Sequence, residues 1–207
     1  MKVVVFGGSG RTGQHVLSAL ERAGHDITLY GRRAPQGWTG KAITGRLDDA
    51  QAVKNALQGA DAVVSALGSS RTGAVCLPAS RSVIAARVPG LRYITVAGAA
   101  VDVPGDAKAM SDRIIGSIFR VLMRKMLAER QAEYQDLAAS DLDYTMLRPP
   151  MLTDGPSTGN WLLSSDTPAS KKIARADVAQ AMVAALERQD LIRTAPFIAA
   201  APRKPVT

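Results

Sequence analysis

Short apolar runs rich in β-branched residues alternate along the chain with longer segments in which apolar positions recur at helical spacing. Runs of this length that are apolar at nearly every position are typical of strands buried on both faces of a parallel sheet. The pattern predicts strands over Lys2–Phe6, Ile27–Tyr30, Lys41–Thr44, Asp61–Ser65, Leu91–Val96, Asp143–Arg148 and Pro196–Ala199.

Helical periodicity fills most of the intervals between these strands. The first predicted helix ends at Gly24, and either Asp48 or Asp49 is placed to cap the second. The predicted helices are Gln14–Ala23, Ala50–Leu57, Pro78–Ala86, Ser111–Leu127 with Ala128–Ala139 as a candidate continuation, and Val178–Glu187. This alternation predicts α/β architecture: a single domain over residues 1–207, with a doubly wound parallel sheet flanked by helices.

A glycine-rich turn, Gly7-Gly8-Ser9-Gly10-Arg11-Thr12-Gly13, joins the first strand to the first helix. Glycines let the backbone approach a pyrophosphate closely, and a helix beginning near Arg11 directs unpaired N–H groups at the same anion. Two registers fit the dinucleotide fingerprint, Gly8-x-Gly10-x-x-Gly13 and Gly7-x-x-Gly10-x-x-Gly13. We prefer the second because Gly7 directly follows the strand. A strand, glycine turn, helix and strand within about thirty residues predict a Rossmann-type nucleotide site.

The end of the second strand indicates which nucleotide is bound. An NAD site usually carries Asp or Glu there for the adenosine ribose, whereas this chain has Gly31-Arg32-Arg33. Guanidinium groups at that position suit a 2′-phosphate. The sequence therefore favours NADP, with NADPH preferred over NADH; two solvated arginines are the alternative.

Small residues follow the fourth and fifth strands, at the edge where a dinucleotide passes. Leu47, in the turn after the third strand, is placed beside the adenine. The remaining residues expected at the cofactor are Ala66, Leu67 and Gly68 after the fourth strand, Ala97 and Gly98 after the fifth, and Pro149 and Pro150 after the sixth.

Two segments inserted in the domain, about residues 100–127 and 149–170, are predicted to form the substrate site. The first contains the amphipathic helix 111–127, which suits a wall or lid of that site, a partner surface, a basic membrane-facing helix, or a core helix with a solvated face. The second is loop-rich, and its Trp161 is the one large ring that could line a substrate site.

Composition excludes several classes of protein. A net charge of +8 over 207 residues raises the question of nucleic acid, but the basic residues are scattered and no recognition module is present. Anionic small molecules are the expected ligands. The single Cys76 excludes an internal disulfide, and no stretch approaches the length of a membrane span. We expect a cytoplasmic protein, monomeric or weakly dimeric, with no metal site.

With these residues in view, the chain resembles the atypical short-chain dehydrogenase/reductase superfamily, in its small NAD(P)H-binding, NmrA-like branch. The glycine turn carries the resemblance, together with Leu142–Pro150 and Ile173–Ala179, which match downstream signatures of that branch in order and spacing. The likeness covers nearly the whole chain and implies reductases of the flavin and biliverdin type.

One departure from the superfamily pattern concerns its proton-transfer pair, a Tyr followed four residues later by Lys. Here Tyr93, Tyr134 and Tyr144 are followed at that spacing by Ala97, Ala138 and Arg148. Ordinary ketone reduction is therefore not expected, since an alkoxide would form without a positioned acid, and no catalytic residue is assigned.

Hydride transfer to a ring acceptor that tolerates negative charge, such as FMN or a linear tetrapyrrole, remains open. Arg71, Arg113 and Arg148 are candidates for holding its anionic groups. The absent pair fits equally well with relatives that bind NADP without turnover and act as redox sensors or regulatory proteins.

Overall fold

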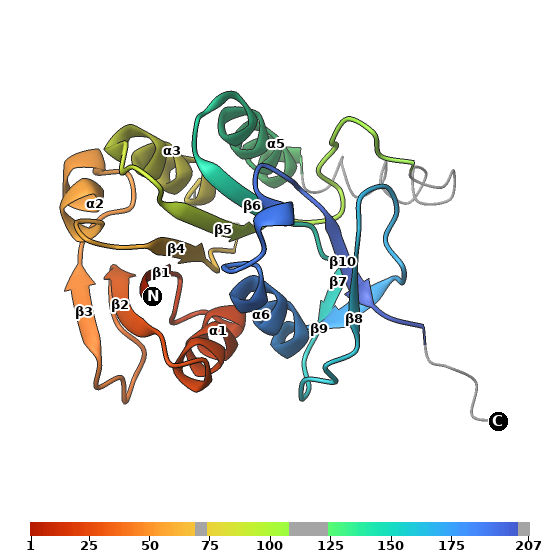
Figure 1. Cartoon of the computed structure of the whole chain (residues 1–207), viewed down its shortest axis with the longest axis horizontal. Helices are drawn as coiled ribbons and strands as arrows, with labels where there is room; N and C mark the ends of the chain where they lie inside the picture. Colours follow the sequence, from red (N-terminus) through yellow and green to blue (C-terminus); the bar gives the residue numbers. More distant parts are fainter. Residues whose placement is uncertain (69–73, 108–123, 203–207) are drawn as a thin grey trace.

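The computed structural model describes residues 1–68, 74–107 and 124–202. Its centre is a parallel sheet of six strands in the order β3-β2-β1-β4-β5-β6 (Figure 1). The strands are β1 Lys2–Phe6, β2 Asp26–Gly31, β3 Lys41–Thr44, β4 Ala62–Ser65, β5 Arg92–Val96 and β6 Asp143–Leu147. The order reverses between β1 and β4, which confirms the predicted doubly wound architecture.

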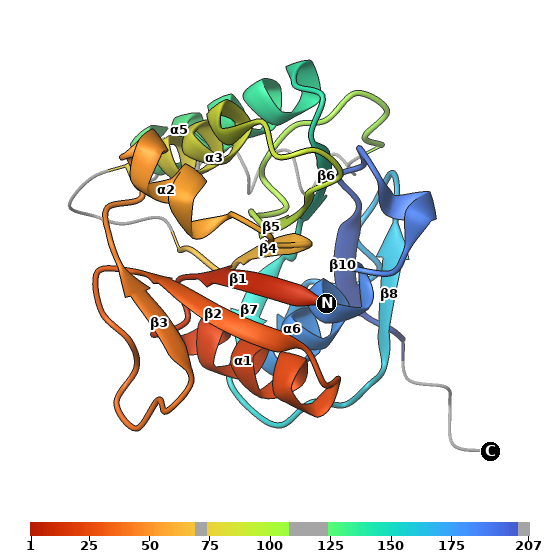
Figure 2. The same cartoon turned by 60° about the vertical axis from the view of Figure 1, so that its left-hand side comes forward.

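Helices cover both faces of this sheet. In Figure 1 the upper face carries α2 Ala50–Ala56, α3 Cys76–Ala86 and α5 Arg124–Ala139. The lower face carries α1 Arg11–Arg22 and α6 Arg175–Ala184, which pack against each other. Turning the molecule shows α3 and α5 side by side over β4 and β5 (Figure 2). Strands covered in this way bury nearly every residue, which explains their continuous apolar runs.

Two apolar clusters form the core, one on each face of the sheet. Alternate residues of β1 divide between them: Val3 and Val5 point toward α1 and α6, whereas Val4 and Phe6 point toward α2 and α3. The fully buried Leu20 completes the first cluster from α1.

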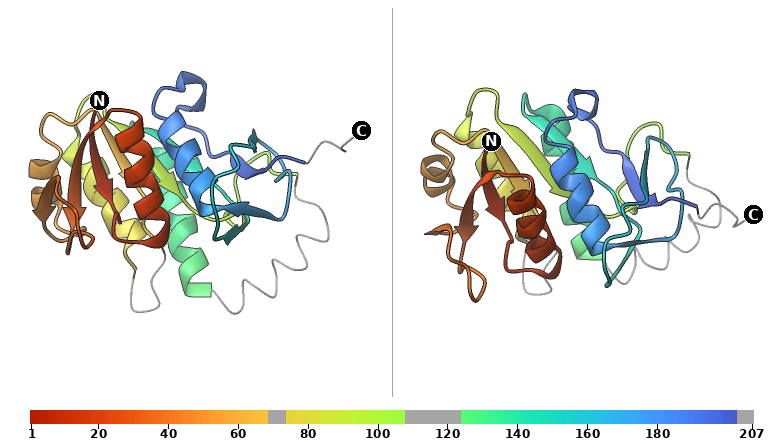
Figure 3. Two further views of the ribbon diagram at one scale, coloured as in Figure 1. Left: turned by 90° about the horizontal axis from the view of Figure 1, so that it is seen from below. Right: turned by 60° about the horizontal axis from the view of Figure 1, so that its bottom comes forward.

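Beside the sixth strand, two small sheets extend the domain (Figure 3). β7 Met151–Thr153 pairs in parallel with β9 Lys172–Ala174, and β8 Trp161–Ser164 pairs antiparallel with β10 Phe197–Ala200. The sequence predicts a loop-rich segment over residues 149–170, and the strands β7 and β8 within it correct that prediction. Both are short, most of their residues are only partly buried, and they lack the alternating burial from which strands are recognised.

The described helix α5 begins at Arg124, so most of the predicted helix 111–127 lies outside the described residues. Its continuation through Ala139 is confirmed. Helix α6 begins at Arg175, one turn before the predicted Val178, and a 3-10 turn, Gln189–Leu191, follows it. Within the described part of the chain, no helix has both the length and the apolar character needed to cross a membrane.

Candidate functional site

The glycine turn brings three backbone segments into closest contact at the carboxyl edge of the sheet. Gly7 has φ +74°, and a Cβ there would lie 3.0 Å from the main chain of Ala66 at the end of β4. A Cβ on Gly13 would lie 2.1 Å from the Gly7 oxygen, so only glycine lets α1 start this close to β1. The Gly10 N–H donates to the same oxygen at 2.9 Å. These contacts favour the register Gly7, Gly10, Gly13.

The N-terminus of α1 is left open to an anion. Its N-cap residue, Gly10, offers no side chain, and its first turn contains no acidic residue. Helix α2 differs, because the Asp49 carboxylate accepts from the N–H groups of Gln51 and Ala52 at 3.1 and 3.0 Å. Asp49 rather than Asp48 is therefore the cap of α2. The uncapped N–H groups and dipole of α1 suit a phosphate.

A cavity of about 250 Å³ opens above this turn, at the point where the strand order reverses. The structure brings into its lining these residues predicted at the cofactor: Gly7, Ser9, Gly10, Arg32, Arg33, Leu47, Ala66, Leu67 and Gly68. Residues not anticipated from the sequence also line it, among them Thr44 at the end of β3 and Val75 before α3.

Two exposed arginines border the cavity where β2 ends. Arg32 and Arg33 form no ion pair with any described residue, whereas the exposed Arg46 and Arg188 each pair with an aspartate two residues later. No carboxylate lines the cavity within the described chain. The β2 end of this cavity is therefore electropositive and lacks the acidic residue of an NAD site.

The turn carrying Leu47 is fixed by Tyr30. The Tyr30 hydroxyl donates to the Arg46 oxygen at 2.9 Å, and a Cβ on Gly45 would lie 2.3 Å from that hydroxyl. Burial raises the pKa of Tyr30, helped by the negative charges of Asp49 and Asp48. The phenol therefore stays neutral and holds Leu47 at the cavity.

Other predicted cofactor residues lie outside the cavity but along the same edge. Arg11, Thr12 and Gly13 form the first turn of α1. Ala97 and Gly98 follow β5, and Pro149 and Pro150 follow β6. These strand ends are tied together: the Ala97 N–H donates to the Leu147 oxygen and the Ala99 N–H to the Pro149 oxygen, both at 2.9 Å.

Arg148 does not face a substrate, and its suggested role in holding an anion is wrong. Its side chain is completely buried and forms a two-pronged ion pair with Asp106, with both contacts at 2.7 Å. It also donates to the main-chain oxygens of Val101 and Ala195, and its guanidinium stacks over the Phe197 ring at 3.8 Å. The guanidinium is therefore engaged in contacts that hold the loop after β5 in place.

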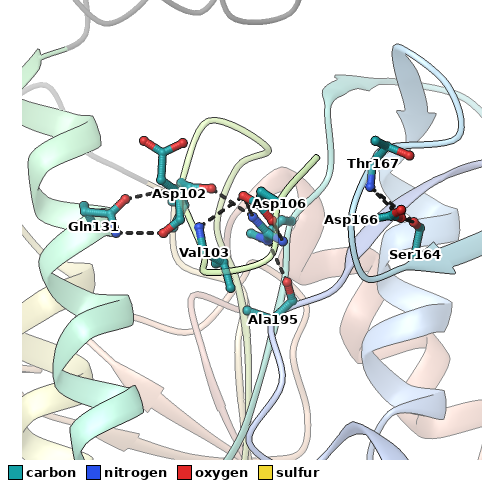
Figure 4. A network of polar contacts seen from close by, with 10 residues as sticks. Asp102, Val103, Asp106, Gln131, Ser164, Asp166, Thr167 and Ala195 are labelled. Atoms are coloured by element: carbon teal, nitrogen blue, oxygen red, sulfur yellow. Dashed lines mark hydrogen bonds and ion pairs between the residues drawn. The ribbon is translucent and has the colours of Figure 1, made fainter. Parts of the chain in front are cut away.

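Gln131 of α5 holds the same loop through hydrogen bonds. Its side-chain amide exchanges two hydrogen bonds of 2.9 Å with the main chain of Asp102, as Figure 4 shows beside Asp106 and Ala195. A lone Gln on a helix gives no signal of this contact in the sequence. The described part of the first predicted substrate segment, up to residue 107, is therefore held by the side chains of Arg148, which directly follows β6, and of Gln131 on α5.

Among the remaining residues predicted at the substrate site, none that the structure describes lies in the lining of the cavity. Arg71 and Arg113 lie outside the described residues. Trp161, on β8, is partly buried against the core cluster on the α1 and α6 face and does not line the cavity. Within the described chain, no group of three or more potential metal ligands occurs.

Of the four tyrosines, all of which the structure describes, only Tyr30 lines the cavity. Tyr93 is completely buried in β5, where burial raises its pKa. Tyr144 is buried in β6 and Tyr134 is half-buried on α5. Tyr30 does line the cavity, but its hydroxyl donates to the Arg46 main chain.

A doubly wound sheet, an uncapped helix after a glycine turn and a cavity at the strand-order reversal define a dinucleotide-binding α/β protein. The chain belongs to the NAD(P)H-binding family, whose model matches residues 7–189. The resemblance to the NmrA-like branch of the atypical short-chain dehydrogenases is confirmed, and family membership identifies the cofactor as a nicotinamide dinucleotide.

Solved structures share this fold over almost the whole chain. The anaerobillin reductase ChuY from Escherichia coli O157:H7 is 24% identical with a TM-score of 0.79, and both chains are covered completely. A protein described as an NADH-flavin reductase from Streptococcus pneumoniae TIGR4 is 21% identical with a TM-score of 0.78, covering 97% of this chain and 99% of that one. One described as an NAD-dependent epimerase/dehydratase from Bacillus halodurans is 25% identical with a TM-score of 0.76, covering 99% and 96%. No curated protein matches the chain.

Proposed function

We propose that this protein is an NADPH-dependent reductase that transfers hydride to an anionic ring acceptor, such as FMN or a linear tetrapyrrole. The observation that carries the proposal is the cavity at the glycine turn. It is bordered by two arginines that form no ion pair with a described residue, and no carboxylate is among its described lining residues. The names anaerobillin reductase and NADH-flavin reductase, carried by two proteins of the same fold, support the reaction class.

The cofactor would lie along the carboxyl edge of the sheet. Arg32 and Arg33 would hold the 2′-phosphate, and Leu47 would contact the adenine. The glycine turn and the first turn of α1, Arg11 to Gly13, would hold the pyrophosphate. Bound NADPH supplies the hydride.

The nicotinamide end would pass the strand ends that lie beyond the glycine turn. Ala66, Leu67 and Gly68 follow β4 and line the cavity, whereas Ala97, Gly98, Pro149 and Pro150 continue the edge beyond it. Small and apolar residues leave room for two flat rings to approach each other. The protein would then act mainly through proximity and orientation of the reacting rings.

Segments 100–127 and 149–170 would form the acceptor site within a single domain. The part of the first segment that is described, up to residue 107, is held by Arg148 and Gln131. We further propose a monomeric or weakly dimeric protein of the cytoplasm, in keeping with its single cysteine.

Mixing purified protein with NADPH and FMN and following NADPH absorbance tests the proposal, with NADH run in parallel. We expect NADPH consumption that requires both protein and flavin. Tight NADPH binding without turnover of FMN or a tetrapyrrole would contradict the reductase and favour a redox sensor. Absence of binding to either nucleotide would contradict the assignment of the glycine turn itself.

A further inference from the structure

The two described ends of the connection from β4 to α3 line the cavity, and they are held by adjacent residues of α5. Leu67 and Gly68 stand at the first end and Val75 at the second, and all three line the cavity. Helix α5 lies beside α3 over β4 and β5 (Figure 2). The buried face of α5 toward these elements is charged: it consists of Glu129, Arg130 and Glu133, with Leu137.

Glu129 holds the second end. One of its carboxylate oxygens accepts from the N–H groups of Val75, Cys76 and Leu77, at 2.7, 2.6 and 3.2 Å. Helix α3 has no capping side chain of its own, so Glu129 serves as its cap from another helix. A carboxylate at a helix N-terminus also interacts favourably with the helix dipole. The position of Val75 therefore depends on α5.

Arg130 holds the first end. Its guanidinium donates to the Leu67 oxygen at 2.5 Å and pairs with Glu133, whose side chain is completely buried. Glu133 in turn accepts from the Thr95 hydroxyl of β5 at 3.3 Å. Burial raises the pKa of Glu133, and the adjacent Arg130 limits that rise. A buried ion pair adds little net stability, so fixing the Leu67 carbonyl is the better account of this one.

The orientation of that carbonyl determines where the next N–H points. The described chain contains no cis peptide bond, and in a trans peptide the C=O and the following N–H point in opposite directions. With the Leu67 oxygen directed at Arg130, the Gly68 N–H is directed away from α5. Gly68 lines the cavity, and no other described residue accepts a hydrogen bond from its N–H.

We propose that Glu129 and Arg130 are positioning residues of the cofactor site, which hold the two described ends of the β4–α3 connection so that Gly68 presents its N–H to the nicotinamide half of the dinucleotide. The proposal rests on the proposed function. It assigns no contact between α5 and the adenosine half, which lies at the far end of the cavity by Arg32 and Arg33.

Two binding probes separate this role from a general loss of stability. NADPH spans the whole site, whereas 2′,5′-ADP carries only the adenosine half. Combining Arg130→Met with Glu133→Gln removes the ion pair without leaving either of its two partners charged and buried alone. We expect the Kd of NADPH to rise about tenfold and that of 2′,5′-ADP to change less than about twofold, with both measured by titration calorimetry.

A matched control comes from the same two helices. Arg81 of α3 forms an ion pair of 2.6 Å with Asp136 of α5 on the exposed side, away from the cavity. Arg81→Met should leave both dissociation constants unchanged. A second variant, Glu129→Ala, acts on the other end of the connection and should show the same selective loss for NADPH. Glu129→Ala also tests the proposal on its own if the variant that combines Arg130→Met with Glu133→Gln does not fold.

The outcomes are distinct. Equal weakening of both probes, or no weakening of NADPH in a folded variant, would overturn the positioning role. Failure of the unaltered protein to bind NADPH would instead overturn the proposed function.

Discussion

The two arginines after β2 provide the most direct test of cofactor preference. Arg32 and Arg33 are exposed, border the cavity and pair with no described carboxylate. A charge-assisted hydrogen bond is worth about 1.5–3 kcal/mol, or roughly ten- to more than a hundredfold in affinity. Exposure to water places these two contacts at the lower end of that range. Replacing both by serine should therefore lower kcat/KM for NADPH by about ten- to a hundredfold.

The assay compares kcat/KM for NADPH and NADH in the unaltered protein and in the double serine variant. NADH has no 2′-phosphate, so its kcat/KM should change less than about threefold. Arg188→Ser serves as the control for net charge, because Arg188 is an exposed arginine beyond the end of α6 that pairs with Asp190. If the NADPH to NADH ratio stays unchanged in the double variant, the 2′-phosphate is not bound by these arginines and the preference for NADP loses its basis.

Three further predictions concern the frame of the site. Gly13→Ala places a Cβ 2.1 Å from the Gly7 oxygen, so thermal unfolding should show a loss of about 1–3 kcal/mol and NADPH titration a loss of affinity; unchanged values would contradict the packing argument. Arg148→Met leaves the Asp106 carboxylate without its two-pronged partner and should cost about 3–5 kcal/mol in urea unfolding; a cost below about 1 kcal/mol would refute it. Burial raises the pKa of Asp177, but hydrogen bonds from the loop before β8 outweigh it and lower the pKa overall. Its contribution to stability is therefore present above the unfolded pKa of about 3.9 and lost as the pH falls through the folded value, so the stability advantage over Asp177→Asn should shrink below about pH 4 in denaturant melts.

The central sheet could be predicted from the sequence because burial on both faces leaves a strong signal. Lys2–Phe6 coincides with β1, and the predicted strands Asp61–Ser65 and Leu91–Val96 each differ from β4 and β5 by one residue. Gly7 and Gly13 could be recognised as well, since the positive φ of Gly7 and the close approach of Gly13 to Gly7 and Gly8 both arise within a few residues along the chain. Elements that depend on residues close together in the sequence can be predicted from short sequence patterns.

Long-range contacts explain what the sequence did not reveal. Arg148 follows a strand that ends at the cofactor edge, so a role in anion binding was reasonable, but its partner Asp106 lies 42 residues earlier. The inward-facing residues of helix α5 could not be predicted either. Its buried face is charged, so apolar periodicity does not indicate which residues face inward. Strands β7 and β8 are stabilised by pairing with β9 and β10 and not by a pattern of their own.

Ion pairs buried at both partners show how the fold arranges irregular backbone beside a ligand. Within the described chain these pairs are Arg130–Glu133 and Arg148–Asp106. Apolar pairs of similar size often give equal stability, so stability alone does not account for them. In each case the arginine also donates to a main-chain oxygen of a segment near the carboxyl edge, such as that of Leu67. Backbone that leaves a sheet beside a ligand still needs partners for its polar groups, and a guanidinium provides five donors in one fixed plane. The two buried arginines therefore hold the irregular backbone near this edge in place.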